Sequence, residues 1–199
     1  MLGRVTTSKI QEIATQQSQG TSHPGFDSSR YYTSNFCTRK SERSDAGYRD
    51  NLYFNYYYLP QCLLKSLSVY VKQSNYDGNI SLGLYSIKNG LPFQLIKSQE
   101  IAVSQADDKV IKKSLFNINL EANWYAISYL ASHTYTISAI HQYYSSNSGY
   151  IYGATPGANF ETGLRFLCPY TNNPPENFIP QNRVTCNRSP LVYFELEQL

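Results

Sequence analysis

The 199-residue sequence contains little charge, since Asp, Glu, Lys and Arg make up 16% of it, against about a quarter in ordinary soluble domains. Ser, Asn, Gln, Thr and 19 Tyr take the place of the missing charges. Disordered chains are rich in charge and poor in aromatic residues, so this composition predicts an ordered protein. Lys and Arg are scattered rather than gathered in a basic stripe, so the sequence does not predict nucleic-acid binding.

Long hydrophobic runs are also missing. No apolar stretch approaches the roughly 20 residues that span a bilayer, and residues 1–20 lack the continuous apolar segment of a secretory signal. We therefore expect no membrane insertion, and we expect assembly inside the cell that makes the protein.

The four cysteines form no CxxC pair, and no His stands at a ligand spacing from any of them. This spacing does not predict a zinc site. Cys168 and Cys186 are placed to pair across two neighbouring strands, although a Cys in a strand is more often a small buried hydrophobe. The sequence leaves these two alternatives open.

Signs of catalysis are sparse. His133 and His141 bracket one predicted strand and stand roughly 27 Å apart at strand rise, too far to share a metal. The sequence has no GxSxG motif and no glycine-rich loop followed by Lys-Ser or Lys-Thr. The one adjacent acidic pair, Asp107-Asp108, falls in a predicted hairpin turn. We therefore predict a protein that is not an enzyme and that has no cofactor or metal.

The N-terminal segment differs from the rest of the chain. Ser8 and Gln11 have the spacing of a capping box, and Ile10 and Ile13 begin an apolar stripe on a short predicted helix. Such a helix is too short to be stable alone, so we expect it to dock on a partner surface. Residues 21–50, which include Tyr31 and Tyr32, are predicted to form an extended assembly arm, with an irregular loop of the same domain as the alternative.

From residue 51 the apolar residues alternate with polar ones. In LKSLSVYVK, residues Leu67, Val69 and Val71 share one face, and NISLGLYSI repeats the pattern with Ile80, Leu82 and Leu84. The Asp77-Gly78 pair between these runs predicts a tight hairpin. Further strands are predicted at 99–103, 109–120, 124–131, 133–142, 149–153, 163–168 and 190–197. The sequence predicts an all-β, antiparallel sandwich over residues 51–199, preceded by a helix and arm over residues 1–50.

An ordered set of segments resembles the jelly-roll domain found in virion proteins of tailed bacteriophages, including tail-associated, fibre and head-decoration proteins. The segments are 51–54 leading to Leu59-Pro60, the alternating strand 64–71, the Leu-Gly-Leu-Tyr strand 80–85, the turn 89–92 with Leu95-Ile96, and 116–126. The sequence departs from the family at Trp124-Tyr125, where the aromatic order is reversed and a Pro-Gly turn is missing. The relationship is therefore distant.

This resemblance implies an antiparallel jelly-roll sandwich in a virion, with the N-terminal arm binding other virion proteins. It also implies a homo-oligomer, with a trimer favoured. We expect a tail, fibre or adaptor component, with a head decoration protein as the alternative. The family has no common set of catalytic or ligand residues to carry over to this sequence.

Aromatic residues supply the remaining candidate contact sites. Tyr56, Tyr57 and Tyr58 stand in a row, and Tyr143, Tyr144 and Tyr150 surround a stretch rich in Ser, Asn and Gly. Rigid rings among small polar residues are typical of adaptable contact loops. We expect the 143–150 stretch to contact a neighbouring subunit. The alternatives are a carbohydrate-binding module that recognises host surface glycan during attachment, and an ordinary loop that shields the edge of the core.

Overall fold

A computed structural model describes residues 42–141, 163–171, 174–178, 183–184, 186 and 188–199. All of the regular structure in these residues is β-strand, which confirms the all-β prediction. The strands are β1 (Glu42–Gly47), β2 (Asn51–Leu59), β3 (Cys62–Gln73), β4 (Gly78–Lys88), β5 (Leu91–Val103), β6 (Asp108–Leu120), β7 (Asn123–Ala131), β8 (Tyr135–His141), β9 (Leu164–Leu167), β10 (Arg183–Val184), β11 (Arg188–Pro190) and β12 (Val192–Gln198).

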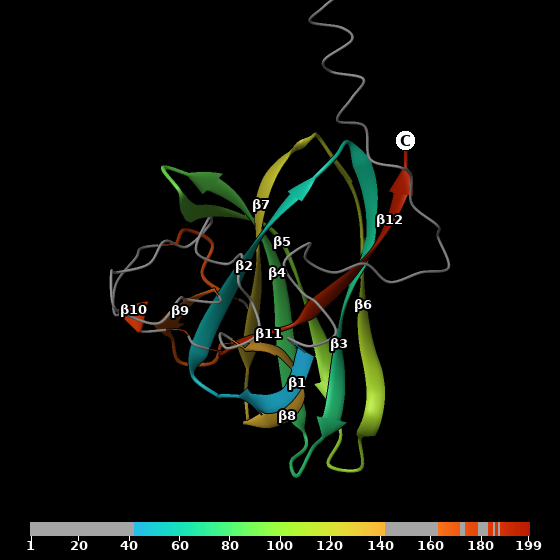
Figure 1. The fold of residues 1–199 in the computed structure, drawn as a ribbon, viewed down its shortest axis with the longest axis vertical. Helices are drawn as coiled ribbons and strands as arrows, with labels where there is room; N and C mark the ends of the chain where they lie inside the picture. Colours follow the sequence, from blue (N-terminus) through green and yellow to red (C-terminus); the bar gives the residue numbers. More distant parts are fainter. Residues whose placement is uncertain (1–41, 142–162, 172–173, 179–182, 185, 187) are drawn as a thin grey trace, which may run out of the picture.

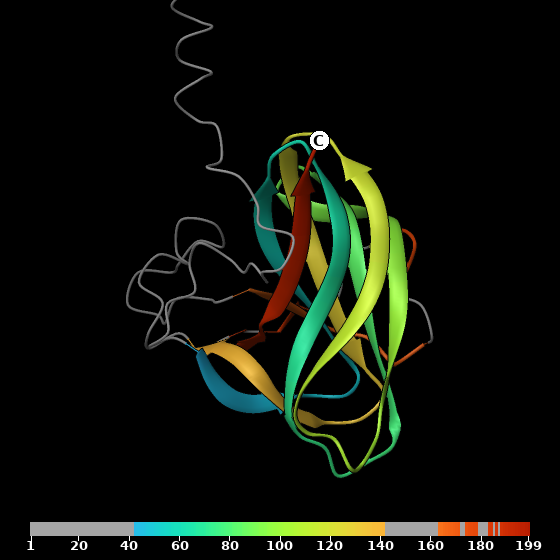
Figure 2. The same cartoon turned by 90° about the vertical axis from the view of Figure 1, so that its right-hand side faces the viewer.

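These strands form two antiparallel sheets that pack face to face (Figures 1 and 2). The first sheet contains β1, β8, β3 and β6 in that order, with β11 paired to β8 and β12 paired to β3. The second sheet has the order β10-β9-β2-β7-β4-β5. The C-terminal strands thus extend the first sheet, and β9 with β10 extends the second beyond β2.

Most connections carry the chain from one sheet to the other. Only β4–β5, β9–β10 and β11–β12 are successive strands of the same sheet within the described residues. The predicted hairpin at Asp77-Gly78 is therefore wrong, because β3 belongs to the first sheet and β4 to the second. The turn at Asp107-Asp108 likewise joins β5 to β6 across the sandwich. A turn motif predicts only the local backbone geometry, and the same geometry can connect two strands of one sheet or two strands of different sheets.

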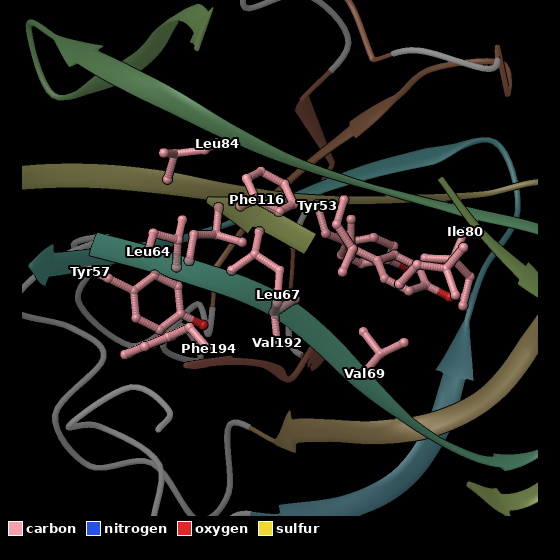
Figure 3. Close-up of a cluster of buried hydrophobic side chains, with 14 of the residues drawn as sticks. Tyr53, Tyr57, Leu64, Leu67, Val69, Ile80, Leu84, Phe116, Val192 and Phe194 are labelled. Carbon is pink, nitrogen blue, oxygen red and sulfur yellow. The ribbon is translucent and has the colours of Figure 1, made fainter. Parts of the chain in front are cut away.

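A large hydrophobic core fills the space between the sheets (Figure 3). The alternating residues predicted to point inward are all fully buried in it, which confirms the inferred faces of β3 and β4: they are Leu67, Val69, Val71, Ile80, Leu82 and Leu84. Tyr57 and Phe194 meet edge to face in this core, with ring centroids 5.3 Å apart (Figure 3). The two-residue period therefore predicts correctly which side chains hold the sheets together.

A second hydrophobic cluster covers the outer face of the second sheet. Phe54 lies at its centre, with the rings of Tyr85 and Phe178 at 5.1 and 4.9 Å. The Tyr85 hydroxyl donates a hydrogen bond to the carbonyl of Pro175 at 2.8 Å. Burial raises the pKa of Tyr85 well above its ordinary value. The segment 174–178 therefore forms a third layer that packs on the second sheet.

The structure places the remaining predicted elements unevenly. The predicted helix, most of the arm and the strand at 149–153 lie outside the described residues. Residues 42–47, which the sequence places in the arm, form β1 and pair with β8. Cys186 belongs to the core between the sheets, whereas Cys168 packs against the cluster on the outer face of the second sheet. These two cysteines are not joined by a disulfide.

Candidate contact surface

The seven contact residues predicted from the sequence all fall outside the described residues: Ile10, Ile13, Tyr31, Tyr32, Tyr143, Tyr144 and Tyr150. Their roles in assembly stay predictions. The candidate surfaces described below come from the sandwich itself.

The row Tyr56-Tyr57-Tyr58 is not a continuous aromatic surface. Tyr56 is buried on the outer face of the second sheet, where its hydroxyl donates to the Gly90 carbonyl at 2.7 Å. Tyr57 is buried in the core between the sheets. Tyr58 alone is exposed. Successive residues of a strand point to opposite faces of the sheet. Residues 52–57 of β2 are buried, so both faces of the strand are covered there, and only near its end is a side chain exposed.

Tyr58 forms an exposed pair with Trp124. The register of β2 and β7 places the two residues directly opposite each other, and their ring centroids lie 5.8 Å apart at an interplanar angle of 65°. Tyr58 is 55% exposed and Trp124 is 41% exposed. The pair stands at the end of the second sheet where β2 ends and β7 begins.

His133 has a structural setting within the described residues. It precedes β8 rather than beginning it, so the predicted strand is shorter than expected. Its ring stacks on Tyr76 at 5.3 Å, and its Nδ1 lies 3.0 Å from Ser132 Oγ. Ser132 Oγ also accepts a hydrogen bond from the Asn79 backbone N–H at 2.9 Å. These contacts join the β3–β4 and β7–β8 connections at one end of the sandwich.

Glu195 lies at the centre of a polar cluster on the first sheet. It accepts hydrogen bonds from Ser66 on β3 and from Lys113 on β6, so it links three neighbouring strands. Partial burial opposes ionisation, but the hydrogen bonds from Lys113 and Ser66 hold the pKa of Glu195 below its ordinary value. Lys65 adds an ion pair with Glu197 at 3.1 Å. The cluster holds β12 against the body of the sheet.

The acidic pair at residues 107 and 108 also has a structural role. Asp107 accepts a hydrogen bond from the Ser104 N–H at 2.7 Å and forms an ion pair with Lys112 at 2.6 Å. Although desolvation opposes ionisation, these partners keep the pKa of Asp107 below its ordinary value. The carboxylate therefore closes the β5–β6 connection.

An open pocket follows the outer edge of β5. It is lined by Gln94, Leu95, Ile96, Lys97, Glu176 and Asn177. Here the segment 176–178 adds to the edge of β5, because Leu95 N donates to the Glu176 carbonyl at 2.8 Å and Phe178 N donates to the Phe93 carbonyl at 2.9 Å. Pro174 and Pro175 precede this segment and have no N–H to continue the pairing.

The edge strand β6 exposes two large apolar side chains, Ile111 and Leu115. The same strand carries Lys109 and Asn117 with positive φ angles of 51° and 47°. The register with β3 also shifts between Leu64 and Ser66, opposite this part of β6. Irregular backbone and exposed lysines protect an edge strand from pairing with another chain. We therefore do not regard this edge as a strand-pairing site.

Neither a metal cluster nor a membrane-spanning helix is found in the described part of the chain. No three His, Cys, Asp or Glu residues gather there at ligand distance. No helix there has the length and hydropathy to cross a bilayer.

Comparison with known proteins gives no family to assign. No protein-family model matches the chain, and no curated protein sequence matches it.

Proposed function

We propose that this chain is a non-enzymatic structural component of a tailed-phage virion, built on a jelly-roll sandwich. The observation that carries the proposal is the strand order. In a jelly roll, eight strands form two sheets of four through two Greek keys. Strands β1 to β8 of this chain follow the orders β1-β8-β3-β6 and β2-β7-β4-β5. Every successive pair of these strands except β4 and β5 changes sheet, as the jelly-roll path requires. Strands β9 to β12 are additions to that framework.

The segments that resemble phage virion modules support the same proposal, because they occupy successive strands. Residues 51–59 coincide with β2, 64–71 lie in β3, and 80–85 lie in β4. The turn at Asn89-Gly90 joins β4 to β5, with φ angles of 53° and 75°. A fold alone does not define a function, so the ordered motifs add the virion assignment to the fold.

The proposed mechanism is mechanical. Two sheets, a buried interlayer core and a third layer over the second sheet make a rigid block. The chain enters this block through β1, the terminal strand of the first sheet. A segment that leads into a terminal strand can bind another protein without interrupting the order of the sheets. We propose that residues 1–41 do so, and that the assembled form is a homotrimer.

The second placement, as a head decoration protein, rests on the same fold and differs only in the partner. Mass spectrometry of purified particles, with tails separated from heads, distinguishes the two placements. The proposal expects the protein in the tail fraction. Its presence in heads alone would favour decoration, and its absence from particles of the producing phage would contradict the virion assignment.

Deletion of residues 1–20 tests the anchoring step. The truncated chain is expected to keep the circular dichroism and the oligomeric mass of the full chain but to be missing from particles. A truncated chain that fails to fold would mean that the segment belongs to the core rather than to an anchor.

A further inference from the structure

Tyr58 and Trp124 are large aromatic side chains that are exposed on the surface of the sandwich. We propose that this ring pair binds a pyranose ring of a carbohydrate. The site is formed within the sandwich, so it does not depend on the virion assignment.

The pair is held rigidly by its neighbours in sequence. Tyr57 and Leu59 flank Tyr58 on β2 and are both buried in the core. Tyr125 follows Trp124 and is buried, and its hydroxyl donates to the Glu121 carbonyl at 2.9 Å. Each exposed ring is therefore attached to backbone that the core fixes. A ligand that stacks on preorganised rings loses little of its binding energy to the ordering of the protein.

The chemistry around the rings suits a neutral, hydroxyl-rich ligand. The C–H face of a pyranose is apolar and packs on an aromatic ring through dispersion and loss of exposed apolar area. Exposed polar residues lie next to the pair along the chain: Gln61 follows the end of β2, Glu121 precedes β7, and Asn123 begins β7. Asn123 Oδ1 accepts a hydrogen bond from the Trp124 backbone N–H at 2.8 Å, which orients its amide. Amide and carboxylate groups of this kind bind hydroxyls at the rim of a ring.

The size of the exposed surface favours a sugar over a protein. An aromatic side chain has about 150–250 Å² of surface to bury, so the exposed fractions of 55% and 41% leave about 200 Å² for the pair. A stable protein–protein interface needs about 800 Å² from each partner. The ring pair supplies about a quarter of that area, which matches a ligand of one or two rings.

Trp124 is the one Trp of the sequence, so Trp emission reports on this site alone. We would titrate the full chain with cellohexaose, chitohexaose and maltohexaose and record Trp emission. We expect a saturable blue shift with at least one of them, because stacking requires only an apolar pyranose face. Tyr58→Ala is expected to weaken that binding by about fivefold or more, while Tyr58→Phe, which keeps the ring, stays within about twofold.

Tyr76→Ala is the matched control, since Tyr76 is also exposed but stacks on His133 at a different connection. It is expected to bind as the unmodified chain does. The inference is overturned if none of the three oligosaccharides shifts the emission of the folded protein, or if Tyr58→Ala leaves the shift unchanged. Emission that changes with protein concentration alone, without sugar, would also overturn it, because the pair would then contact a second copy.

Discussion

Phe178 holds the third layer of the structure on the second sheet, and its removal tests whether that layer is part of the folded unit. Its ring lies 4.6 Å from the ring of Phe166 and 4.9 Å from that of Phe54, both edge to face. Only 8% of the residue is exposed. About 200 Å² of aromatic surface at about 25 cal/mol per Å² gives an upper bound of about 4–5 kcal/mol. Compactness of the unfolded chain and the Cβ that Ala retains reduce the expected loss to about 3 kcal/mol.

We therefore expect Phe178→Ala to lower the free energy of unfolding by about 3 kcal/mol, equivalent to about 6–12 °C in Tm for a chain of this size. Urea unfolding followed by circular dichroism measures the change. Phe93→Ala is the matched control, because Phe93 lies on β5, the strand with which residues 176–178 pair, but is 41% exposed. Its replacement is expected to lower the free energy of unfolding by less than about 1 kcal/mol. Equal losses in the free energy of unfolding for the two substitutions would refute the reasoning. Residues 174–178 would then be a surface loop that does not stabilise the fold.

Two further substitutions test the packing and the electrostatics. A Cβ at Gly83 would lie 2.5 Å from Ser128 Oγ. Gly83→Ala is therefore expected to lower the free energy of unfolding, measured with urea, by about 1–3 kcal/mol. Adding Ser128→Ala should recover part of that loss, because it removes the clashing hydroxyl, which is buried without a hydrogen-bond partner; a simply additive double variant would contradict this. The folded-state pKa of Glu195 is below its ordinary 4.5, so its ionisation stabilises the fold above about pH 4.5, and that contribution is lost as the pH falls through the lower folded value. Glu195→Gln should therefore flatten the fall in urea midpoint between about pH 7 and pH 3, and an unchanged pH profile would exclude this role.

The strands were predictable from the sequence because their signal is local. Alternation in LKSLSVYVK and NISLGLYSI identifies both the strands and their buried faces, and the observed burial confirms it. The sheet to which each strand belongs was not predictable in this way. Asp77-Gly78 marks a turn, but nothing in the turn distinguishes a hairpin from a crossing between sheets. That choice depends on β6, β8 and β12, which occupy the hydrogen-bonding edges of β3 from far along the chain.

The second hydrophobic cluster had a signal in the sequence that an alternating pattern overlooks. The run NLYFNYYYL of β2 is apolar or aromatic at nearly every position, which is typical of a strand covered on both faces. The covering segment 174–178 could not be identified, because it has no regular period. The Tyr58–Trp124 pair was likewise hidden, since it depends on the register between β2 and β7.

The order of strands around β3 supports both the fold and the proposed function, and backbone NOEs measured by NMR test it most directly. The account predicts cross-strand NOEs between Val69 and Lys112 on one side of β3 and between Ser68 and Tyr193 on the other, as the two registers require. A hairpin at residues 75–78 would instead bring Val71 opposite Leu82. Strong NOEs between β3 and β4 in place of those to β6 and β12 would contradict the strand order and the virion assignment drawn from it.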